Sequence, residues 1–175
     1  MRRLLLLRHA KSERSEAGGR DHARSLNQRG RGEAPKIGAY MARHGLVPDR
    51  AMVSTAARAQ ETWTLAAAAF ATAPATISVE RLYEAGPQAI LELLRELPAD
   101  IGTLLVVGHN PGLQELAALL VASGEVEARE RLREGLPTAG LAAIDFAFDD
   151  WRKLHAQSGR LERFVSPRSL EPATD

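Results

Sequence analysis

Residues 4–13, with the sequence LLLLRHAKSE, join an apolar segment directly to a basic one. Residues 3–7 are predicted to form a strand that is apolar on both faces, which is typical of a central strand in a sheet covered on both sides. Arg8, His9 and Lys11 follow at once, although charged side chains are costly to bury. The abrupt change indicates that the strand ends at a site where an anion can offset the positive charge.

The rest of the chain alternates between strand-like and helix-like segments. Further strands are predicted over residues 49–55, 76–80, 104–107, 140–148 and 160–165, the last as an edge strand. Helices are predicted over residues 28–44, from a Ser54 or Thr55 cap to 72, 87–97, 111–122 and 126–134. This alternation predicts a three-layer α/β/α sandwich with a mostly parallel central sheet. Residues 11–27 are predicted to form a long loop of the kind that often carries function.

Composition limits the class of protein. The 175 residues fit one domain, over 1–175, in which we expect residues 166–175 to form a loose tail. A net charge of +1, with acidic and basic residues intermixed, argues against a nucleic-acid partner. The absence of cysteine excludes disulfides, thiolate metal sites and a cysteine nucleophile, and fits a cytoplasmic protein. The apolar runs are too short for a signal peptide or a membrane span, so no membrane partner is expected.

Basic side chains follow three of the predicted strands. Arg8 and His9 end the first strand, Arg58 lies on the helical turn after the second, and His109 and Asn110 follow the strand over residues 104–107. In an open α/β sheet, ligands bind outside the carboxyl ends of the strands. If the strands are neighbours, two histidines and two arginines converge on one crevice.

These residue types suit a multiply charged anion such as phosphate. Arginine offers planar pairs of donors that match phosphate oxygens, and the start of a helix at Asn110 adds backbone N–H groups. A neutral histidine can attack phosphorus, and a second one can donate a hydrogen bond to the transferring group. His9 and His109 are not expected to bind a metal, because the arginines would repel a cation and no carboxylate motif completes the ligand set. No cofactor is expected either, since Gly30-x-Gly32 lacks the context of a dinucleotide-binding loop.

Four segments taken together resemble a known family. LRHAKSE (7–13) resembles the RHG-type signature of the histidine phosphatase superfamily, with alanine in place of glycine. STAARAQET, LYEAG and VGHNPG are similar to the segments that supply its arginine, its acidic residue and its second histidine, in the same order. RHAKS, SLNQRGRGEA and PTAGLAAIDF most resemble the small SixA-like phosphohistidine phosphatases. The resemblance covers about residues 3–170.

The resemblance implies roles for individual residues. His9 is the nucleophile that becomes transiently phosphorylated, and Arg8, Arg58 and a protonated His109 bind the phosphoryl group. Glu84 lies where many relatives have a general acid.

Three further polar residues complete the predicted site. Asp21 on the polar loop is a second candidate for proton delivery. Ser12 is a candidate phosphate contact, with a plain turn role as the alternative, and Asn110 is a candidate through the helix start.

The resemblance also implies the fold and the activity. The expected fold is phosphoglycerate-mutase-like without a large lid insertion. The expected activity is a metal-independent phosphatase with a phosphohistidine enzyme intermediate, which removes phosphate from phosphohistidine in a protein. Such a pocket also holds inorganic phosphate or another oxyanion. The alternatives are a phosphatase for small phosphomonoesters and a non-catalytic module that binds phosphorylated ligands.

Overall fold

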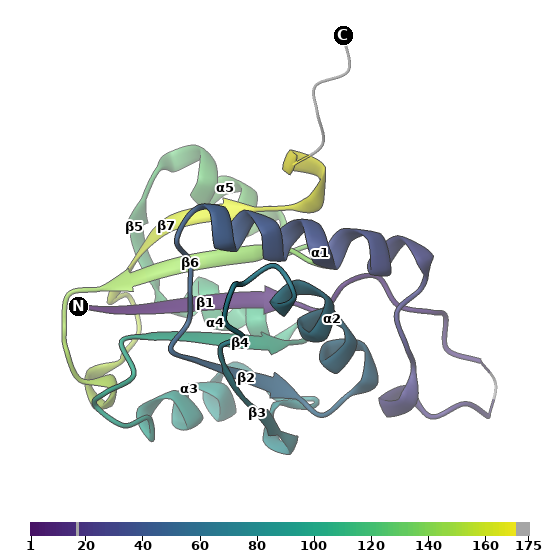
Figure 1. Cartoon of the computed structure of the whole chain (residues 1–175). Coiled ribbons are helices and arrows are strands. Elements are labelled where there is room, and N and C mark those ends of the chain that lie inside the picture. Colours follow the sequence, from purple (N-terminus) through teal and green to yellow (C-terminus); the bar gives the residue numbers. More distant parts are fainter. Residues whose placement is uncertain (17, 171–175) are drawn as a thin grey trace, which may run out of the picture.

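The computed structural model describes residues 1–16 and 18–170, and it contains one seven-stranded sheet (Figure 1). The strands are β1 (Arg2–Arg8), β2 (Arg50–Ser54), β3 (Ala75–Val79), β4 (Thr103–Gly108), β5 (Val121–Gly124), β6 (Leu141–Phe146) and β7 (Gly159–Val165). The α-helices are α1 (Gln28–Arg43), α2 (Ala57–Ala67), α3 (Pro87–Arg95), α4 (Gly112–Leu120) and α5 (Val126–Glu134). Short 3-10 turns are η1 (Asp21–Ala23), η2 (Glu80–Leu82), η3 (Trp151–Lys153) and η4 (Pro167–Leu170).

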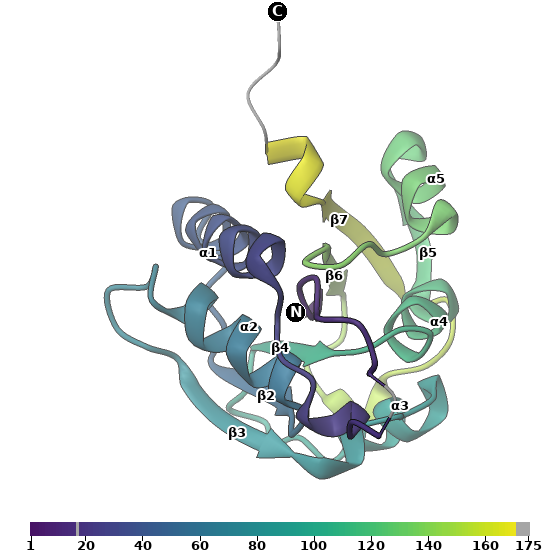
Figure 2. The ribbon, with the colours of Figure 1, turned by 90° about the vertical axis from the view of Figure 1, so that its right-hand side faces the viewer.

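The four leucines of β1 form the middle of the core. Leu4 and Leu6 belong to one buried cluster, with side chains from α3, α4 and α5, while Leu5 and Leu7 belong to the other, with side chains from α1 and α2. Figure 2 shows these two groups of helices on opposite faces of the sheet. The alternation of a strand sends successive side chains to opposite faces, so a run of leucine fills both layers. The predicted three-layer α/β/α sandwich is confirmed.

Strand order brings the basic strand ends together. The sheet has the order β3-β2-β4-β1-β6-β7-β5, so β1, β4 and β2 are successive neighbours. They run parallel, with Arg8 opposite Gly108 and Val53 opposite Val107, and their carboxyl ends therefore share one edge. β6 runs antiparallel to both β1 and β7, and the other pairings are parallel, as predicted for a mostly parallel sheet. The long loop that follows β1 lies at the same edge (Figure 1).

Two predicted elements differ from the structure at the far side of the sheet. The helix predicted over residues 111–122 begins at Gly112 and ends at Leu120, and Val121 turns into β5. β5 pairs with β7, so β7 is an inner strand and the prediction of an edge strand over residues 160–165 is wrong. The apolar pattern of α4 runs on into Val121, and only the pairing with the distant β7 ends the helix there.

The remaining connections are compact. α2 ends at Ala67, earlier than the predicted residue 72, and the longest connection between strands and helices, residues 9–27, contains η1. Within the described residues no large lid insertion is present, as predicted. Residues 166–170 are folded where a loose tail was expected, because Pro167 is buried and Leu170 packs against the core cluster of α1 and α2. Residues 171–175 of that tail lie outside the described residues, and no helix among the described ones is long and apolar enough to cross a membrane.

Candidate active site

His9 is held at the end of β1 by backbone hydrogen bonds on both sides. Its N–H donates to the carbonyl of Gly108 at 3.0 Å, and its own carbonyl accepts from the N–H of Ala139 at 3.1 Å. The next N–H, that of Ala10, donates to Thr62 Oγ1 on α2 at 2.9 Å. Because the backbone is fixed by β4, by the turn before β6 and by α2, the imidazole enters the site from a rigid base.

The His9 ring has a defined tautomer. Its Nδ1 lies 2.8 Å from the carbonyl oxygen of Ala10, which can only accept, so Nδ1 carries the hydrogen and Nε2 keeps a free electron pair. The side chain is only 7% exposed. Burial, and then the neighbouring His109, Arg58 and Arg8, lower the pKa of His9 to about 3. At neutral pH the ring is therefore an uncharged base with Nε2 available for attack.

His109, at the end of β4, faces His9 with 5.2 Å between ring centroids. Its Nε2 lies 2.8 Å from Ser54 Oγ at the end of β2. Burial first, and then Arg58, lower the pKa of His109 to about 4. Without a bound anion, a half-buried ring beside guanidinium groups favours the neutral form, and a protonated His109 in contact with the phosphoryl group stays a prediction.

Two guanidinium groups enclose the histidine pair, and each is only partly satisfied by the protein. Arg8 Nη1 donates to the carbonyl of Leu136 at 3.1 Å, while Arg58 Nη1 donates to the carbonyl of Asp21 at 2.8 Å. Within residues 1–16 and 18–170, four buried side-chain nitrogen or oxygen atoms lack a hydrogen-bond partner. Three of them are Arg8 Nε, Arg58 Nε and His109 Nδ1. Buried polar groups without partners are rare, so three in one place indicate a site for a ligand that accepts hydrogen bonds.

A cleft of about 780 Å³ lies over this cluster and is lined by Arg8, His9, Arg58 and His109 among others. Lys11 is exposed on its wall. The structure thus brings together the four residues that the sequence places at the strand ends. Among the described residues, no group of three or more histidine, aspartate or glutamate side chains is arranged to hold a metal ion.

Two predicted phosphate contacts have partners within the protein. Ser12 Oγ accepts a hydrogen bond from Arg24 Nη1 at 2.5 Å, which leaves only its own hydrogen for another acceptor. Asn110 Nδ2 donates to the carbonyl of Leu136 at 2.8 Å, and its Oδ1 accepts from the N–H of Gln114 at 3.3 Å. The amide of Asn110 therefore ties the turn after β4 to a neighbouring loop. α4 begins at Gly112, with Pro111 and not Asn110 at the capping position.

The two candidate proton donors differ in their surroundings. The carboxylate of Asp21 accepts hydrogen bonds from Tyr83, Arg24 and Arg58, which hold its pKa well below the ordinary value. These contacts stabilise the ionised form, which disfavours Asp21 as a proton donor. Glu84 is exposed, has a positive φ of 58°, and lines a neighbouring cavity of about 270 Å³ together with Arg58 and His109.

Comparison with known proteins agrees with this arrangement. Residues 4–86 match the family model "Histidine phosphatase superfamily (branch 1)". The uncharacterized protein Rv1276c of Mycobacterium tuberculosis is 35% identical over 164 residues, which cover 93% of this chain and all of that one. The chain belongs to the histidine phosphatase superfamily. An uncharacterized Mycobacterium leprae protein, ML1117, is 32% identical over 85% of this chain and 89% of its own.

Solved structures place this histidine phosphatase near the SixA proteins, as predicted. The candidate phosphohistidine phosphatase SixA of Agrobacterium tumefaciens is 31% identical, with a TM-score of 0.79 over 95% of this chain and 99% of that one. Its counterpart from Nakamurella multipartitia is 27% identical, with a TM-score of 0.80 over 95% and 96% of the two chains. These neighbours confirm the predicted phosphoglycerate-mutase-like fold.

Sequence reasoning missed several polar residues of this histidine phosphatase. Ser54 was considered only as a helix cap, but its hydroxyl contacts His109. Arg24 lies in the cleft wall, and nothing in the sequence separates it from Arg14 or Arg20 in the same polar loop. The sequence contains a weak indication that Tyr83 belongs to the site, because Tyr83 directly precedes the candidate general acid Glu84 in the LYEAG segment.

Proposed function

We propose that this protein is a phosphatase that transfers a phosphoryl group first to His9 and then to water. Three unpartnered buried nitrogen atoms around the free Nε2 of His9 carry the proposal: Arg8 Nε, Arg58 Nε and His109 Nδ1. A tetrahedral oxyanion offers enough acceptors to satisfy all three, and its charge offsets the two guanidinium groups. A tungstate complex of the protein histidine phosphatase SixA, which has the same fold at 19% identity, supports an oxyanion as the ligand.

The first step forms a bond between His9 Nε2 and phosphorus. The bond between phosphorus and the leaving group breaks, and its electron pair departs with the leaving group. Arg8 and Arg58 neutralise the charge that spreads over the equatorial oxygens, which is the main requirement of phosphoryl transfer. Because His9 is neutral in the free protein, no proton has to leave the nucleophile before attack.

The second step transfers the phosphoryl group from His9 to water. The P–N bond breaks, one hydrogen of the water is released as a proton, and inorganic phosphate leaves with Nε2 restored as a free base. His109 Nδ1 is a suitable donor to a phosphoryl oxygen in both steps. Ser54 Oγ accepts from the N–H of Ala56 at 3.3 Å and can donate its own hydrogen to His109 Nε2. In that tautomer the ring hydrogen of His109 lies on Nδ1. No step calls for a metal ion.

Phosphohistidine in a protein is the substrate that the site supports best. The cleft is open and lacks a lid among the described residues, so a phosphorylated side chain on a protein surface can reach His9. Hydrogen bonds favour the ionised form of Asp21, which makes it a poor proton donor and supports a substrate with a labile P–N bond over an alkyl ester. The similarity to SixA proteins points to the same substrate class.

A small phosphomonoester is the second candidate, and Glu84 is the observation that favours it. An ester oxygen leaves best with a proton, and Glu84 lies beside Arg58 and His109 at the edge of the site. Comparing phosphate release from a phosphohistidine-bearing protein and from p-nitrophenyl phosphate, both in excess chelator, separates the two candidates. We expect faster release from the phosphoprotein.

The covalent intermediate is tested on the same samples. Rapid quenching under alkaline conditions should trap phosphate on wild-type protein in an acid-labile form, and His9→Asn should trap none and release none. His155→Asn, which changes an exposed histidine outside the cleft, is the matched control and should behave as wild type. Near-normal turnover by His9→Asn, or strict dependence on a metal ion, would contradict the mechanism.

A further inference from the structure

Asp21 is a hydrogen-bonding hub beside the cleft, and its partners Arg24 and Arg58 line that cleft. Its Oδ2 accepts from Tyr83 Oη at 2.6 Å and from Arg58 Nη2 at 3.1 Å, while its Oδ1 accepts from Arg24 Nη2 at 2.9 Å. Its backbone carbonyl accepts from Arg58 Nη1 at 2.8 Å. One residue of the long loop therefore contacts both ends of the Arg58 fork as well as a second arginine of the cleft.

The Arg58 guanidinium is used along one edge only. A guanidinium has five N–H donors in a plane, and its Nη1/Nη2 edge is occupied by the carbonyl and the carboxylate of Asp21. Arg58 Nε is buried without a partner among the described residues, so the Nε/Nη2 edge keeps Nε–H and the second Nη2 hydrogen. That edge has the spacing that two oxygens of one phosphoryl group require. Asp21 thus holds Arg58 from one edge and leaves the other free.

The loop segment that carries Asp21 is itself anchored. Tyr83 lies before α3, and its hydroxyl joins that segment to η1 through Asp21. His22, the next residue of η1, lies with Nε2 2.8 Å from Thr55 Oγ1 and packs edge-on against the Tyr83 ring. η1 is therefore fixed to two other parts of the chain, and the Asp21 acceptors are in place before a ligand arrives.

We propose that Asp21 is a positioning residue that fixes Arg58 for oxyanion binding, and that Tyr83 acts through Asp21. The inference rests on the proposed function and assigns Asp21 a role different from proton delivery. An arginine that is already oriented loses less side-chain entropy when the anion binds. In this proposal, the affinity gained in this way exceeds the affinity lost through repulsion between the Asp21 carboxylate and the anion. A competing role, in which Asp21 blocks Arg58 until substrate displaces it, predicts the opposite effect of removing the carboxylate.

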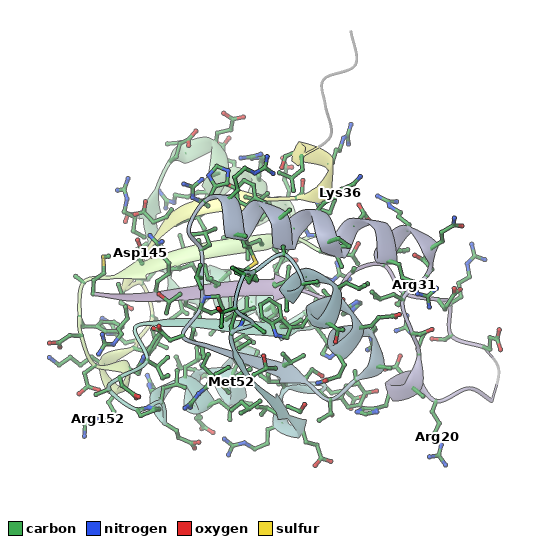
Figure 3. All side chains as sticks on the ribbon, viewed as in Figure 1. Arg20, Arg31, Lys36, Met52, Asp145 and Arg152 are labelled. Carbon is green, nitrogen blue, oxygen red and sulfur yellow. The ribbon has the colours of Figure 1, made fainter. Side chains whose placement is uncertain are left out.

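The test measures tungstate and inorganic phosphate affinity by calorimetry, without turnover. Asp21→Asn keeps the shape of the side chain, and we expect it to weaken tungstate binding about tenfold, the order expected for one hydrogen bond to a charged group. Unchanged or tighter binding overturns the proposal. Asp150→Asn is the control, since Asp150 pairs with Arg152, which lies at the opposite end of the molecule from the loop that carries Arg20 (Figure 3).

Tyr83 is tested by a double-mutant cycle. Tyr83→Phe keeps the ring against Arg58 and His109 but removes the hydroxyl, and we expect about threefold weaker tungstate binding. In the Asp21→Asn background the same change should cost nothing further, because the two act as one unit. Additive losses would show that Tyr83 does not act through Asp21.

Kinetics separate positioning from a merely structural effect. With p-nitrophenyl phosphate, we expect Asp21→Asn to raise KM while kcat changes less. A structural loss would lower the active fraction, and so kcat, while KM and the tungstate affinity stayed constant. Wild-type protein that binds tungstate without turnover would refute the proposed phosphatase and leave the Asp21 measurement valid. Wild-type protein that binds neither oxyanion would refute both.

Discussion

Ser54 and His109 join the ends of two neighbouring strands through one hydrogen bond, with Ser54 Oγ 2.8 Å from His109 Nε2. Ser54 is completely buried, so no water can replace it at this position. The contact orients the imidazole, and when Ser54 is the donor the ring hydrogen of His109 lies on Nδ1. Ser54 ends β2, His109 follows β4 and His9 follows β1, and β4 lies between the other two strands. The hydrogen-bond donor that His109 offers to a phosphoryl group is therefore oriented from β2, on the side away from His9.

Replacing this hydroxyl should impair both catalysis and folding stability. For Ser54→Ala we expect kcat/KM to fall about tenfold, because His109 loses the partner that fixes its tautomer, and the free energy of unfolding to fall by about 1–2 kcal/mol. Ser78→Ala, which removes an exposed hydroxyl on the adjacent β3, should change neither quantity. Equal kcat/KM values for the two variants would show that Ser54 does not orient the ring.

Acid should destabilise the folded protein through the two site histidines. The folded-state pKa values of His9, about 3, and His109, about 4, lie below the ordinary 6.5. Between these values the unfolded chain binds protons that the folded chain does not, so stability falls as pH drops from 6.5 towards 4. The slope is at most about 1.4 kcal/mol per pH unit for each histidine.

Urea unfolding at several pH values between 7.5 and 4.5 measures this dependence. The free energy of unfolding should fall less steeply with decreasing pH in His9→Asn than in wild type. His155→Asn, at an exposed position, should show the same pH dependence as wild type. Parallel curves for wild type and His9→Asn would mean that His9 titrates normally in the folded protein.

The sequence predicts the central part of the site because that part depends on strand ends. Arg8 and His9 directly follow one apolar strand and His109 follows another, and parallel pairing of neighbours is enough to bring them together. The contacts of Asp21, Arg24 and Tyr83 depend instead on how residues 11–27 fold back over the sheet edge. That segment has no apolar period, so nothing local fixes which charges face inward.

The same difference between local and long-range contacts explains which parts of the fold were predicted wrongly. α1 begins and ends close to prediction because Asn27 caps it and Gly45 follows it, which are local signals. β5 could not be predicted from residues 121–124, because the strand exists only through its pairing with β7, far away in the sequence. The neutral state of His109 likewise depends on burial that arises only when the sheet and the loops are assembled.

Replacing either of two glycines of α1 by alanine should change the free energy of unfolding, but in opposite directions. A Cβ on Gly30 would lie 2.1 Å from the carbonyl oxygen of Lys11, whereas a Cβ on Gly32 would meet nothing within 4 Å. Gly30→Ala should lower the free energy of unfolding by about 1–3 kcal/mol and reduce kcat/KM, because it displaces the backbone two residues after His9. Gly32→Ala should raise the free energy of unfolding by about 1 kcal/mol with unchanged activity.

Chemical unfolding and turnover of the two variants, measured side by side, check this pair. A fully active and stable Gly30→Ala would show that the contact between α1 and the turn after His9 can relax without consequence.

Glu84 should matter only for substrates with poor leaving groups. General acids typically contribute about 100-fold or more, so we expect Glu84→Gln to slow hydrolysis of an alkyl phosphomonoester by about 100-fold. Hydrolysis of p-nitrophenyl phosphate should change less than about threefold, because nitrophenolate leaves without a proton. Glu80→Gln, at an exposed position four residues earlier, is the control. Equal losses on both substrates would assign Glu84 to substrate binding instead of proton transfer.

The hydrogen bond from His9 Nδ1 to the carbonyl of Ala10 makes the nucleophile insensitive to mutation in one respect. The acceptor is a main-chain oxygen, so no exchange of one side chain for another can withdraw it. Ala10 is completely buried, so the volume of the side chain limits which residue fits this position. Glycine in place of alanine would keep the carbonyl, and the same nitrogen of His9 would remain free to attack.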